Sequence, residues 1–457
     1  MLVRPHHRTG LPAMALALVI LCGAAAIAQE APAKAPLELT LDQAVAYGLQ
    51  HNPELAAARR ELAAAGQKFT AARRERQPRL DAVFEGRYES IRRMAVDMIP
   101  EGLYSEDRLF GHGLFALDAV FTVPLYTGGR IPANVRRARI ERDIAADFVA
   151  RVEDNLSYEI TRTYLSILQQ DQVIAATAKS IEALTETQRV MREFRQVGKI
   201  PSLDLYRVNS QLADVQAGLV RDQAMRRTML AELRALLGLP GDQELRLADE
   251  LTFAPRGLFR DESLRHAFRS NPAYAAAGKR VEQQRQTVQM ERAELKPQVE
   301  LSGYGGAAGS RHGPPIDRWG LKVMASQYLF DGGRIKARVR AEEEMLRQEE
   351  EMLRQTGLEL AVAVETALNE AEDAAARVKA LETALREAEE ALRLEQLKYS
   401  NGKGVVNDVL LAQAMLLEVE VGFYTAQRDY GVALAALQRA IGRMAPSLTA
   451  PPTAPGG

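Results

Sequence analysis

Apolar residues recur at helical spacing over most of the chain. In two long stretches they lie three, four or seven positions apart, which is the spacing of a coiled-coil seam. The positions are Ile160, Ile167, Ile174 and Ile181 in the first stretch, and Leu381, Leu385, Ala388 and Leu392 in the second. Each stretch follows a Gly-Gly-Arg sequence and ends at a glycine, Gly198 or Gly402. The pattern predicts two very long helices, at 131–197 and 335–401.

Four shorter segments alternate apolar and polar residues, which predicts β-strands. The apolar positions are Leu80, Ala82, Phe84 and Tyr88; Phe115, Leu117, Ala119, Phe121, Val123 and Leu125; Val299 and Leu301; and Trp319, Leu321, Val323 and Ala325. Transmembrane-barrel strands show this alternation, and so does a soluble sheet on a helical core. An N-terminal export sequence and the lack of a globular core beside the strands favour the barrel. Four strands are too few to close one, because about eight are needed, so the barrel would be shared between chains.

The sequence contains two copies of one plan. Asn52-Pro53 recurs as Asn271-Pro272 at an offset of 219, and Gly128-Gly129-Arg130 recurs as Gly332-Gly333-Arg334 at an offset of 204. Other matches keep these offsets: Gln67 with Gln286, Pro78 with Pro297, Gly198-Lys199 with Gly402-Lys403, Asp204 with Asp408, and Gly238 with Gly442. The two offsets differ by 15 residues, all placed between the proline and Gly-Gly-Arg. We therefore expect the connection 89–112 to be the longer hairpin loop, and to be extracellular.

Each copy has the same order of elements. A helical stretch of about 37 residues, at 41–77 or 260–296, precedes two strands, the long helix, and another stretch of about 37 residues, at 202–238 or 405–441. Thr40 or Asp42 and Asp261 are expected to cap the first helices. A 67-residue helix is about 100 Å long at 1.5 Å per residue. Two shorter helices stacked end to end match that length, so the elements predict one long antiparallel bundle.

The domain organisation follows from the repeat. Residues 1–28 have arginines, an uncharged run and Ala26-Ile27-Ala28, as expected for a secretory signal peptide. A retained membrane anchor and a lipid-anchored Cys22 are alternatives. The first repeat spans 29–238, a linker spans 239–259, the second repeat spans 260–442, and a proline-rich tail spans 443–457.

Composition argues against an enzyme and against a nucleic-acid partner. The net charge is −1, which gives nucleic acid no electrostatic attraction, and the one cysteine, Cys22, can form neither an internal disulfide nor a cysteine metal site. The histidines lack metal-ligand spacing, and no Gly-Lys pair belongs to a phosphate-binding loop. The glycine-rich segment 305–309 is expected to be a flexible loop. The Glu-rich runs 342–344 and 349–351 are interpreted as a solvated coiled-coil face. No cofactor and no metal are predicted.

The chain resembles the TolC-like outer-membrane factors from Leu39 to Met444. The opening Leu39-Thr40-Leu41-Asp42-Gln43-Ala44, the Pro124–Arg130 and Leu329–Arg334 joints, and Tyr399–Leu410 are similar to that family's motifs. The resemblance implies a mostly α fold with a small β part: a long antiparallel coiled-coil barrel, with four strands per chain in a shared trimeric transmembrane β-barrel of 12 strands. It also implies an outer-membrane exit duct with its helices in the periplasm. The implied partners are two further copies, outer-membrane lipid, a periplasmic adaptor and an inner-membrane pump of an efflux or type I secretion system.

The resemblance also assigns roles to residues. Asp204 and Asp408 fall at the acidic ring of the tunnel mouth, and Tyr399 falls at a gate contact. For Asp204, a capping role at the helix start is the alternative. The tips Gly198, Lys199, Gly402 and Lys403 would contact the adaptor, and Gly128, Gly129, Arg130, Gly332, Gly333 and Arg334 form the strand-to-helix turns. Gly404 and Leu411 replace charged residues of the family, so its closing salt bridges are in doubt. The alternative function is a periplasmic structural coiled coil without a pore.

Overall fold

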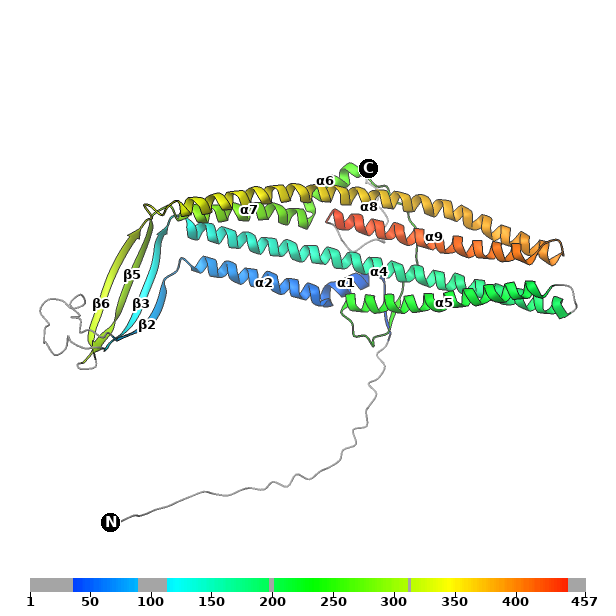
Figure 1. Cartoon of the computed structure of the whole chain (residues 1–457), viewed down its shortest axis with the longest axis horizontal. Coiled ribbons are helices and arrows are strands. Elements are labelled where there is room, and N and C mark those ends of the chain that lie inside the picture. The colour runs from blue at the N-terminus through cyan, green and yellow to red at the C-terminus, as the bar shows by residue number, and fades with distance from the viewer. Residues whose placement is uncertain (1–35, 89–112, 197–200, 311–313, 443–457) are drawn as a thin grey trace, which may run out of the picture.

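The protein is a long rod with a β-sheet at one end and helices along the rest (Figure 1). The computed structural model describes residues 36–88, 113–196, 201–310 and 314–442. The expected signal peptide with Cys22, the loop 89–112, the tip residues Gly198 and Lys199, and the tail 443–457 lie outside the described residues. Within them, both copies of the repeat have the expected order of helices and strands.

The sheet has four antiparallel strands in the order β2-β3-β5-β6. They are β2 (Arg79–Tyr88), β3 (Gly113–Thr127), β5 (Gln298–Ser310) and β6 (Ile316–Ser326). All four predicted strands are confirmed, but the expectation of a loop at 305–309 is wrong. These residues belong to β5 and pair with both β3 and β6. Glycine is a poor strand former by itself, so the pairing on both sides decides the conformation of this segment.

One face of the sheet is apolar and exposed. Leu80 and Phe84 of β2 are each 72% exposed, and Trp319 of β6 is 83% exposed. The opposite face carries charged side chains, including Asp118, which is 8% exposed. The predicted alternation is therefore present, with the apolar side chains pointing away from the buried polar ones. In Figure 1 the sheet extends beyond the ends of the helices, so none of the described helices covers it.

Two long helices span the rod. They are α4 (Arg130–Gln196) and α8 (Arg334–Ser400), each of 67 residues. Each turns back at the tip into α5 (Ser202–Leu237) or α9 (Val406–Ala440). The prediction of two long helices and two returning helices is confirmed to within two residues at each end. Gly238 and Gly442 follow the returning helices with φ of 70° and 67°, a left-handed conformation that favours glycine.

The expectation of a single helix at 41–77 and at 260–296 is wrong. Each stretch is two helices, α1 (Leu41–His51) with α2 (Pro53–Arg74), and α6 (Arg260–Ser270) with α7 (Pro272–Ala293). The extended backbone of Asn52 and Asn271 interrupts the helices, and each asparagine caps the helix that follows. Asn52 also donates to the Leu236 carbonyl at 2.9 Å, so the break fastens α1 and α2 to the end of α5.

Only part of the capping prediction is confirmed. Thr40 caps α1 through a capping box with Gln43, and Asp42 lies in the first turn. Asp261 does not cap α6; the residue at the cap is Phe259, which makes no side-chain cap hydrogen bond. Asp261 instead places a negative charge in the first turn, which favours the positive end of the helix dipole.

The helices lie side by side along the rod (Figure 1). α2 and α5 are stacked end to end against α4, while α7 and α9 pack against both α4 and α8. Halfway along, two short strands that the sequence did not predict, β1 (Leu37–Leu39) and β4 (Leu245–Leu247), pair in parallel. The linker 239–259 thus packs on the rod together with residues 37–39, and we call these two segments the collar. The buried apolar residues form several separate clusters along the rod.

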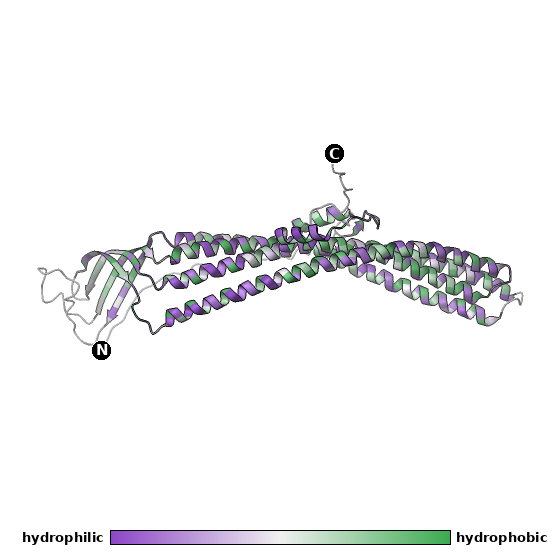
Figure 2. Ribbon diagram, turned by 90° about the horizontal axis from the view of Figure 1, so that it is seen from above, coloured by the Kyte–Doolittle hydropathy of each residue, from purple (hydrophilic) through white to green (hydrophobic). Residues whose placement is uncertain are grey.

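One described helix, α9, is long and apolar enough to cross a membrane by length and composition alone. Only 22% of its most apolar window is buried within the chain. In the fold α9 packs along α4 and α8 as part of the rod. Figure 2 shows hydrophobic and hydrophilic residues interleaved along the helices rather than gathered into one apolar segment. The buried apolar residues of α9, among them Val409, Leu434 and Leu437, contribute to this packing.

Candidate functional site

The Gly-Gly-Arg turns join the sheet to the long helices as expected. Gly128 and Gly129 have φ of 63° and 100°, and Gly332 and Gly333 have φ of 67° and 85°. Residues that have a side chain rarely adopt this left-handed backbone conformation, so both turns favour glycine. Arg130 forms an ion pair of 2.8 Å with Glu75 at the end of α2, which holds the first joint closed.

The second arginine has a different contact. Arg334 lies over the ring of Tyr328 with 6.0 Å between the guanidinium carbon and the ring centroid. The ion pairs of this joint are made by Arg338, which reaches Glu291 and Glu294 at 2.7 Å and 3.1 Å. Glu294 is the repeat counterpart of Glu75. At both joints, therefore, a glutamate at the end of the preceding helix forms an ion pair with an arginine at the start of the long helix.

Sequence reasoning missed the caps of the long helices. The Thr127 hydroxyl accepts from the amide of Ile131 at 3.3 Å. In the second copy the Asp331 carboxylate accepts from the amides of Gly333 at 2.9 Å and Ile335 at 2.8 Å. These hydrogen bonds lower the pKa of Asp331, the one from Ile335 most strongly. The offset of 204 relates Thr127 to Asp331. This correspondence is the sequence signal by which both caps could have been predicted.

The polar face of the sheet contains a buried ion pair between strands that are not neighbours. Arg318 of β6 reaches across β5 to Asp118 of β3, with Nε donating to Oδ1 at 3.0 Å and a second bond from Nη2 to Oδ2. Gly306 lies between them in the register. A Cβ atom at Gly306 would lie 2.5 Å from Asp118 Oδ1, so the glycine leaves the space that the pair occupies. Arg318 also lies over the ring of Tyr304, 5.6 Å from its centroid.

Two buried tyrosines hold the collar. The Tyr164 hydroxyl of α4 donates to the Leu39 carbonyl at 2.9 Å and bonds Asp249 at 3.0 Å. Asp249 in turn accepts from the amide of Leu41 at 2.6 Å. Burial is the main cause that raises the pKa of Tyr164 above its ordinary value. Tyr430 of α9 accepts from the amide of Arg256 at 2.8 Å, so each half of the linker is fastened to a different helix.

The tip of the rod is an apolar cluster that includes Tyr399. Leu184 and Met191 of α4, Leu205 and Val208 of α5, and Val406 and Leu410 of α9 form its buried part. Tyr399 packs against this cluster, and its hydroxyl donates to the Met191 sulfur at 2.9 Å. Burial, and then the negative charge of Asp204, raise the pKa of Tyr399. Tyr399 thus contacts helices of the other repeat within one chain.

The two acidic tip residues lie in different surroundings. Asp204 is half-buried in the first turn of α5, beside Tyr399, with Arg207 at 3.9 Å. The residue at the N-cap of α5 is Pro201, and no side-chain hydrogen bond caps this helix. The alternative of a capping role for Asp204 is therefore wrong. Asp408 is exposed in the first turn of α9. Among the described residues, no group of three or more metal-ligating side chains is formed.

The turn after α8 explains one departure from the family. Gly402 has φ of 71°, and the amide of Lys403 bonds the Lys398 carbonyl at 2.9 Å. A Cβ atom at Gly404 would lie 3.1 Å from the Tyr399 backbone nitrogen, so this tight turn favours a residue without a side chain. The other departure, Leu411, is 66% exposed. The tip therefore presents apolar surface at Leu411.

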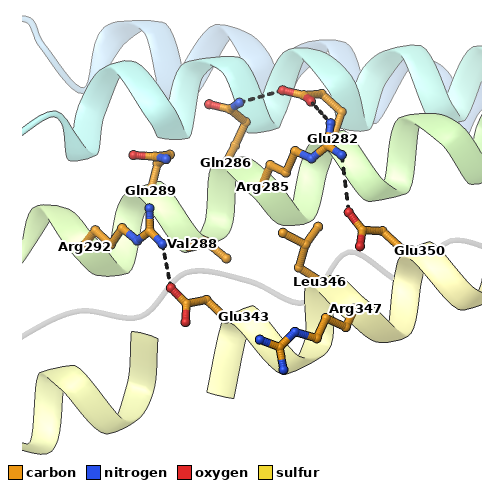
Figure 3. Close-up of a pocket in the computed structure, with 10 residues that line it drawn as sticks. All are labelled: Glu282, Arg285, Gln286, Val288, Gln289, Arg292, Glu343, Leu346, Arg347 and Glu350. Carbon is orange, nitrogen blue, oxygen red and sulfur yellow. Dashed lines mark hydrogen bonds and ion pairs between the residues drawn. The ribbon is translucent and has the colours of Figure 1, made fainter. Parts of the chain in front are cut away.

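A polar groove of about 500 Å³ lies between α7 and α8 (Figure 3). Its arginines are paired with glutamates: Arg292 with Glu343 at 2.6 Å and Arg285 with Glu350 at 3.3 Å. Because the charges compensate one another, the groove lacks the unbalanced charge or convergent ligands of a binding site. Its ion pairs instead hold the two helices together.

The chain matches the family model described as outer membrane efflux protein over residues 46–239 and 264–443. No curated protein sequence matches it. Among solved structures it is similar to the outer-membrane channel OprN, with 21% identity, TM-score 0.76, and coverage of 88% of this chain and 89% of that one. The outer membrane protein VceC from Vibrio cholerae has 20% identity, TM-score 0.75, and coverage of 88% and 96%. The MtrE outer membrane channel of Neisseria gonorrhoeae, in its open state, has 18% identity, TM-score 0.72, and coverage of 88% and 89%.

The family match spans both repeats and more than half of the chain, and the structural likeness gives the same fold. The matched residues include the four strands, both Gly-Gly-Arg joints and the duplicated helices, apart from the first few residues of the stretches that begin at 41 and 260. The chain therefore belongs to the outer membrane efflux protein family, whose members are outer-membrane exit ducts rather than enzymes.

Proposed function

We propose that three copies of this chain assemble into one exit duct, with a shared 12-stranded barrel in the outer membrane and a helical tunnel in the periplasm. The sheet carries this proposal. Its apolar face is exposed, and β2 and β6 are edge strands. A strand edge in lipid leaves backbone N–H and C=O groups without hydrogen bonds, and each such group costs several kcal/mol of free energy. Because β2 and β6 run antiparallel, β6 of one copy can pair with β2 of the next and remove every edge.

The test is fractionation followed by electrophoresis. Outer membranes of a Gram-negative host should contain the protein as a trimer in SDS that dissociates on heating. Replacing Leu80 and Phe84 by aspartate should abolish membrane assembly. Replacing Met415 by aspartate, an exposed residue on α9 away from the sheet, should leave membrane insertion intact. Recovery of wild-type protein only as soluble monomer would refute the proposal and support a pore-free rod.

We propose that the tip is the tunnel mouth, with Asp408 in an acidic ring and Asp204 beside it. The tip turns, including Gly402 and Lys403, would receive a periplasmic adaptor that links the duct to an inner-membrane pump. Rings of acidic side chains favour cations in pores. Single-channel recording should therefore show weaker block by divalent cations for Asp408→Ala. Unchanged block and unchanged ion selectivity would place Asp408 outside the lumen.

We propose that this mouth closes through apolar packing rather than salt bridges. Tyr399 is already seated in the tip cluster, Gly404 replaces the family arginine, and Leu411 offers apolar surface. Tyr399→Ala, which removes the ring from the cluster, should raise open probability more than Tyr399→Phe. Equal effects of the two variants would assign the closing contact to the hydroxyl instead.

We propose that the connection 89–112 is extracellular, since it joins β2 and β3 at the end of the sheet far from the helices. An epitope tag inserted at 100–106 should bind antibody on intact cells. Binding only after permeabilisation would reverse the orientation.

A further inference from the structure

The two long helices are repeat counterparts, yet they are buried to very different extents. α4 buries 21 residues and α8 buries 10 over the same length of 67 residues. α4 is flanked by α2 and α5 on one side and by α7 and α9 on the other. α8 contacts α7 and α9 along one side and the short helix α6 near its middle, and it lies at the edge of the chain (Figure 1). The counterparts of α7 and α9 are α2 and α5, which lie at the opposite edge.

We infer that the exposed side of α8 packs on α2 and α5 of a second copy, contact for contact as α4 packs on α7 and α9 within the chain. This inference rests on the proposed trimer and deepens it, because it names the residue pairs between copies. Each pair follows from a contact of α4 by applying the offsets of the repeat: 204 to residues after Gly128, and 219 to residues before Pro78.

The first contact is an ion pair. Lys279 of α7 bonds Asp147 of α4 at 2.6 Å, and the Asp147 side chain is 17% exposed. The counterparts are Arg60 of α2 and Glu351 of α8, again a base and an acid. The Glu351 side chain is 67% exposed in the single chain. Within its own chain Glu351 pairs with Arg354, three residues along α8, at 3.4 Å. The charges of the contact are thus kept, and Arg60 of a second copy would join this exposed pair.

The second contact keeps both residue types. Arg136 of α4 donates to the Gln286 side chain of α7 at 2.7 Å. The counterparts are Arg340 of α8 and Gln67 of α2, and both are exposed. They lie on opposite edges of the chain, so a bond between them requires two copies.

Contacts of α4 with α9 also convert into compatible pairs. Gln169 bonds the Thr425 hydroxyl at 3.4 Å. The counterparts, Asp373 of α8 and Arg221 of α5, have opposite charges. Asp373 already has a salt bridge to Arg377, four residues along α8, at 2.9 Å, so Arg221 of the next copy would join an existing exposed pair.

An aromatic contact converts into an apolar one. Arg439 lies 4.0 Å from the ring centroid of Tyr158. The counterparts are Ala235 of α5 and Val362 of α8. Val362 is 64% exposed in the single chain. Ala235 of a second copy would cover it.

The joints show the same asymmetry. A Cβ atom at Gly128 would lie 2.5 Å from the Ala293 carbonyl at the end of α7, whereas one at Gly332 would meet nothing within 4 Å. The counterpart of Ala293 is Arg74, at the end of α2. The open space beside Gly332 is where the end of α2 from a second copy would lie.

Cross-linking tests the second contact directly. In a background with Cys22, the single cysteine of the sequence, replaced by serine, the pair Gln67→Cys and Arg340→Cys is treated with a short bis-maleimide in native membranes. Denaturing electrophoresis should then show covalent dimers and trimers. The matched control, Arg136→Cys with Gln286→Cys, should cross-link within one chain and run as a monomer. In a second control, Gln67→Cys with Glu342→Cys, the thiol at 342 faces α7 of its own chain, where Glu342 bonds Gln284 at 2.6 Å, so little ladder is expected.

A charge exchange gives an independent measurement. Glu351→Arg should lower the temperature at which the trimer dissociates in SDS, and adding Arg60→Glu should restore it. A persistent trimer with no covalent ladder and no restoration would overturn the inferred packing while leaving the exit duct standing. Absence of any trimer, with all variants monomeric, would overturn the proposed assembly and the inferred packing together.

Discussion

The ion pair between Asp118 and Arg318 provides a sharp test of how the sheet is held together. The two strands that carry the pair are separated by β5, whose segment 305–309 is rich in glycine and specifies its register weakly. An ion pair that spans three strands fixes the position of all of them. We predict that removing either partner destabilises the assembled sheet, and that the two removals differ.

The size of each effect follows from burial. Breaking a buried pair by removing one partner costs about 3–5 kcal/mol, because the other charge is left uncompensated. The Asp118 side chain is 10% exposed and that of Arg318 is 22% exposed. Arg318→Met leaves the more buried charge alone, so we expect about 3 kcal/mol per chain. Asp118→Asn leaves Arg318 with partial water access and the Tyr304 ring, so about 2 kcal/mol is expected.

The assay is the dissociation temperature of the proposed trimer, supported by urea unfolding in detergent. The exposed pair Arg79–Asp81 on β2, with side chains 73% and 38% exposed, is the control, and Asp81→Asn should change stability by less than about 1 kcal/mol. The double variant Asp118→Asn with Arg318→Met should be less destabilised than the sum of the singles, because neither charge remains. A larger loss for Asp118→Asn than for Arg318→Met, or strict additivity, would refute the reasoning.

Three further predictions concern the helices and joints. Tyr164→Phe removes the hydroxyl that bonds the collar and should lower stability by about 1–2 kcal/mol, measured by thermal unfolding; no change would show that the collar is held by packing alone. Gly128→Ala should impair trimer yield more than Gly129→Ala, because both have positive φ but only Gly128 also contacts the end of α7; equal yields would exclude that contact. The raised pKa of Tyr399 favours the neutral hydroxyl in the folded tip. The free energy of unfolding should therefore fall as pH rises above about 10, where the unfolded tyrosine ionises, and should continue to fall up to the folded pKa. Tyr399→Phe should remove this part of the alkaline loss, as measured by unfolding curves at several pH values.

The long elements could be predicted from the sequence because local chemistry fixes their ends. Gly128-Gly129 and Gly332-Gly333 supply the left-handed turns at which the long helices begin, and the heptad spacing of Ile160 and Ile167 matches two fully buried residues. Each of these signals acts within a few residues of the position it determines. Duplication then doubled the evidence, since the same signal appeared at a constant offset.

What could not be predicted depends on partners distant in the chain. The break at Asn52 is fixed by a bond to Leu236, and β1 forms only because β4 lies beside it, more than 200 residues away. The same holds for segment 305–309, which becomes a strand through pairing on both sides. At the tip, the sequence could place Tyr399 by resemblance, but its contact with Met191 depends on how two repeats pack.

The helices of this protein lie side by side like a wall, and this arrangement explains why the core is rich in alanine. Helices that lie side by side, with water on both broad faces, can bury only their flanks. Small residues let neighbouring helices approach along those flanks, and many of the buried positions of α2 and α8 are alanines. The same geometry puts ion pairs such as Lys279–Asp147 at the borders of each contact, where long side chains still reach water. A single chain built this way has two unfinished flanks, α8 on one side and α2 with α5 on the other. Since these flanks carry the repeat counterparts of residues that already pack inside the chain, closing the wall with further copies would repeat that helix packing, with a hydrogen bond and a ring contact replaced by an ion pair and an apolar contact.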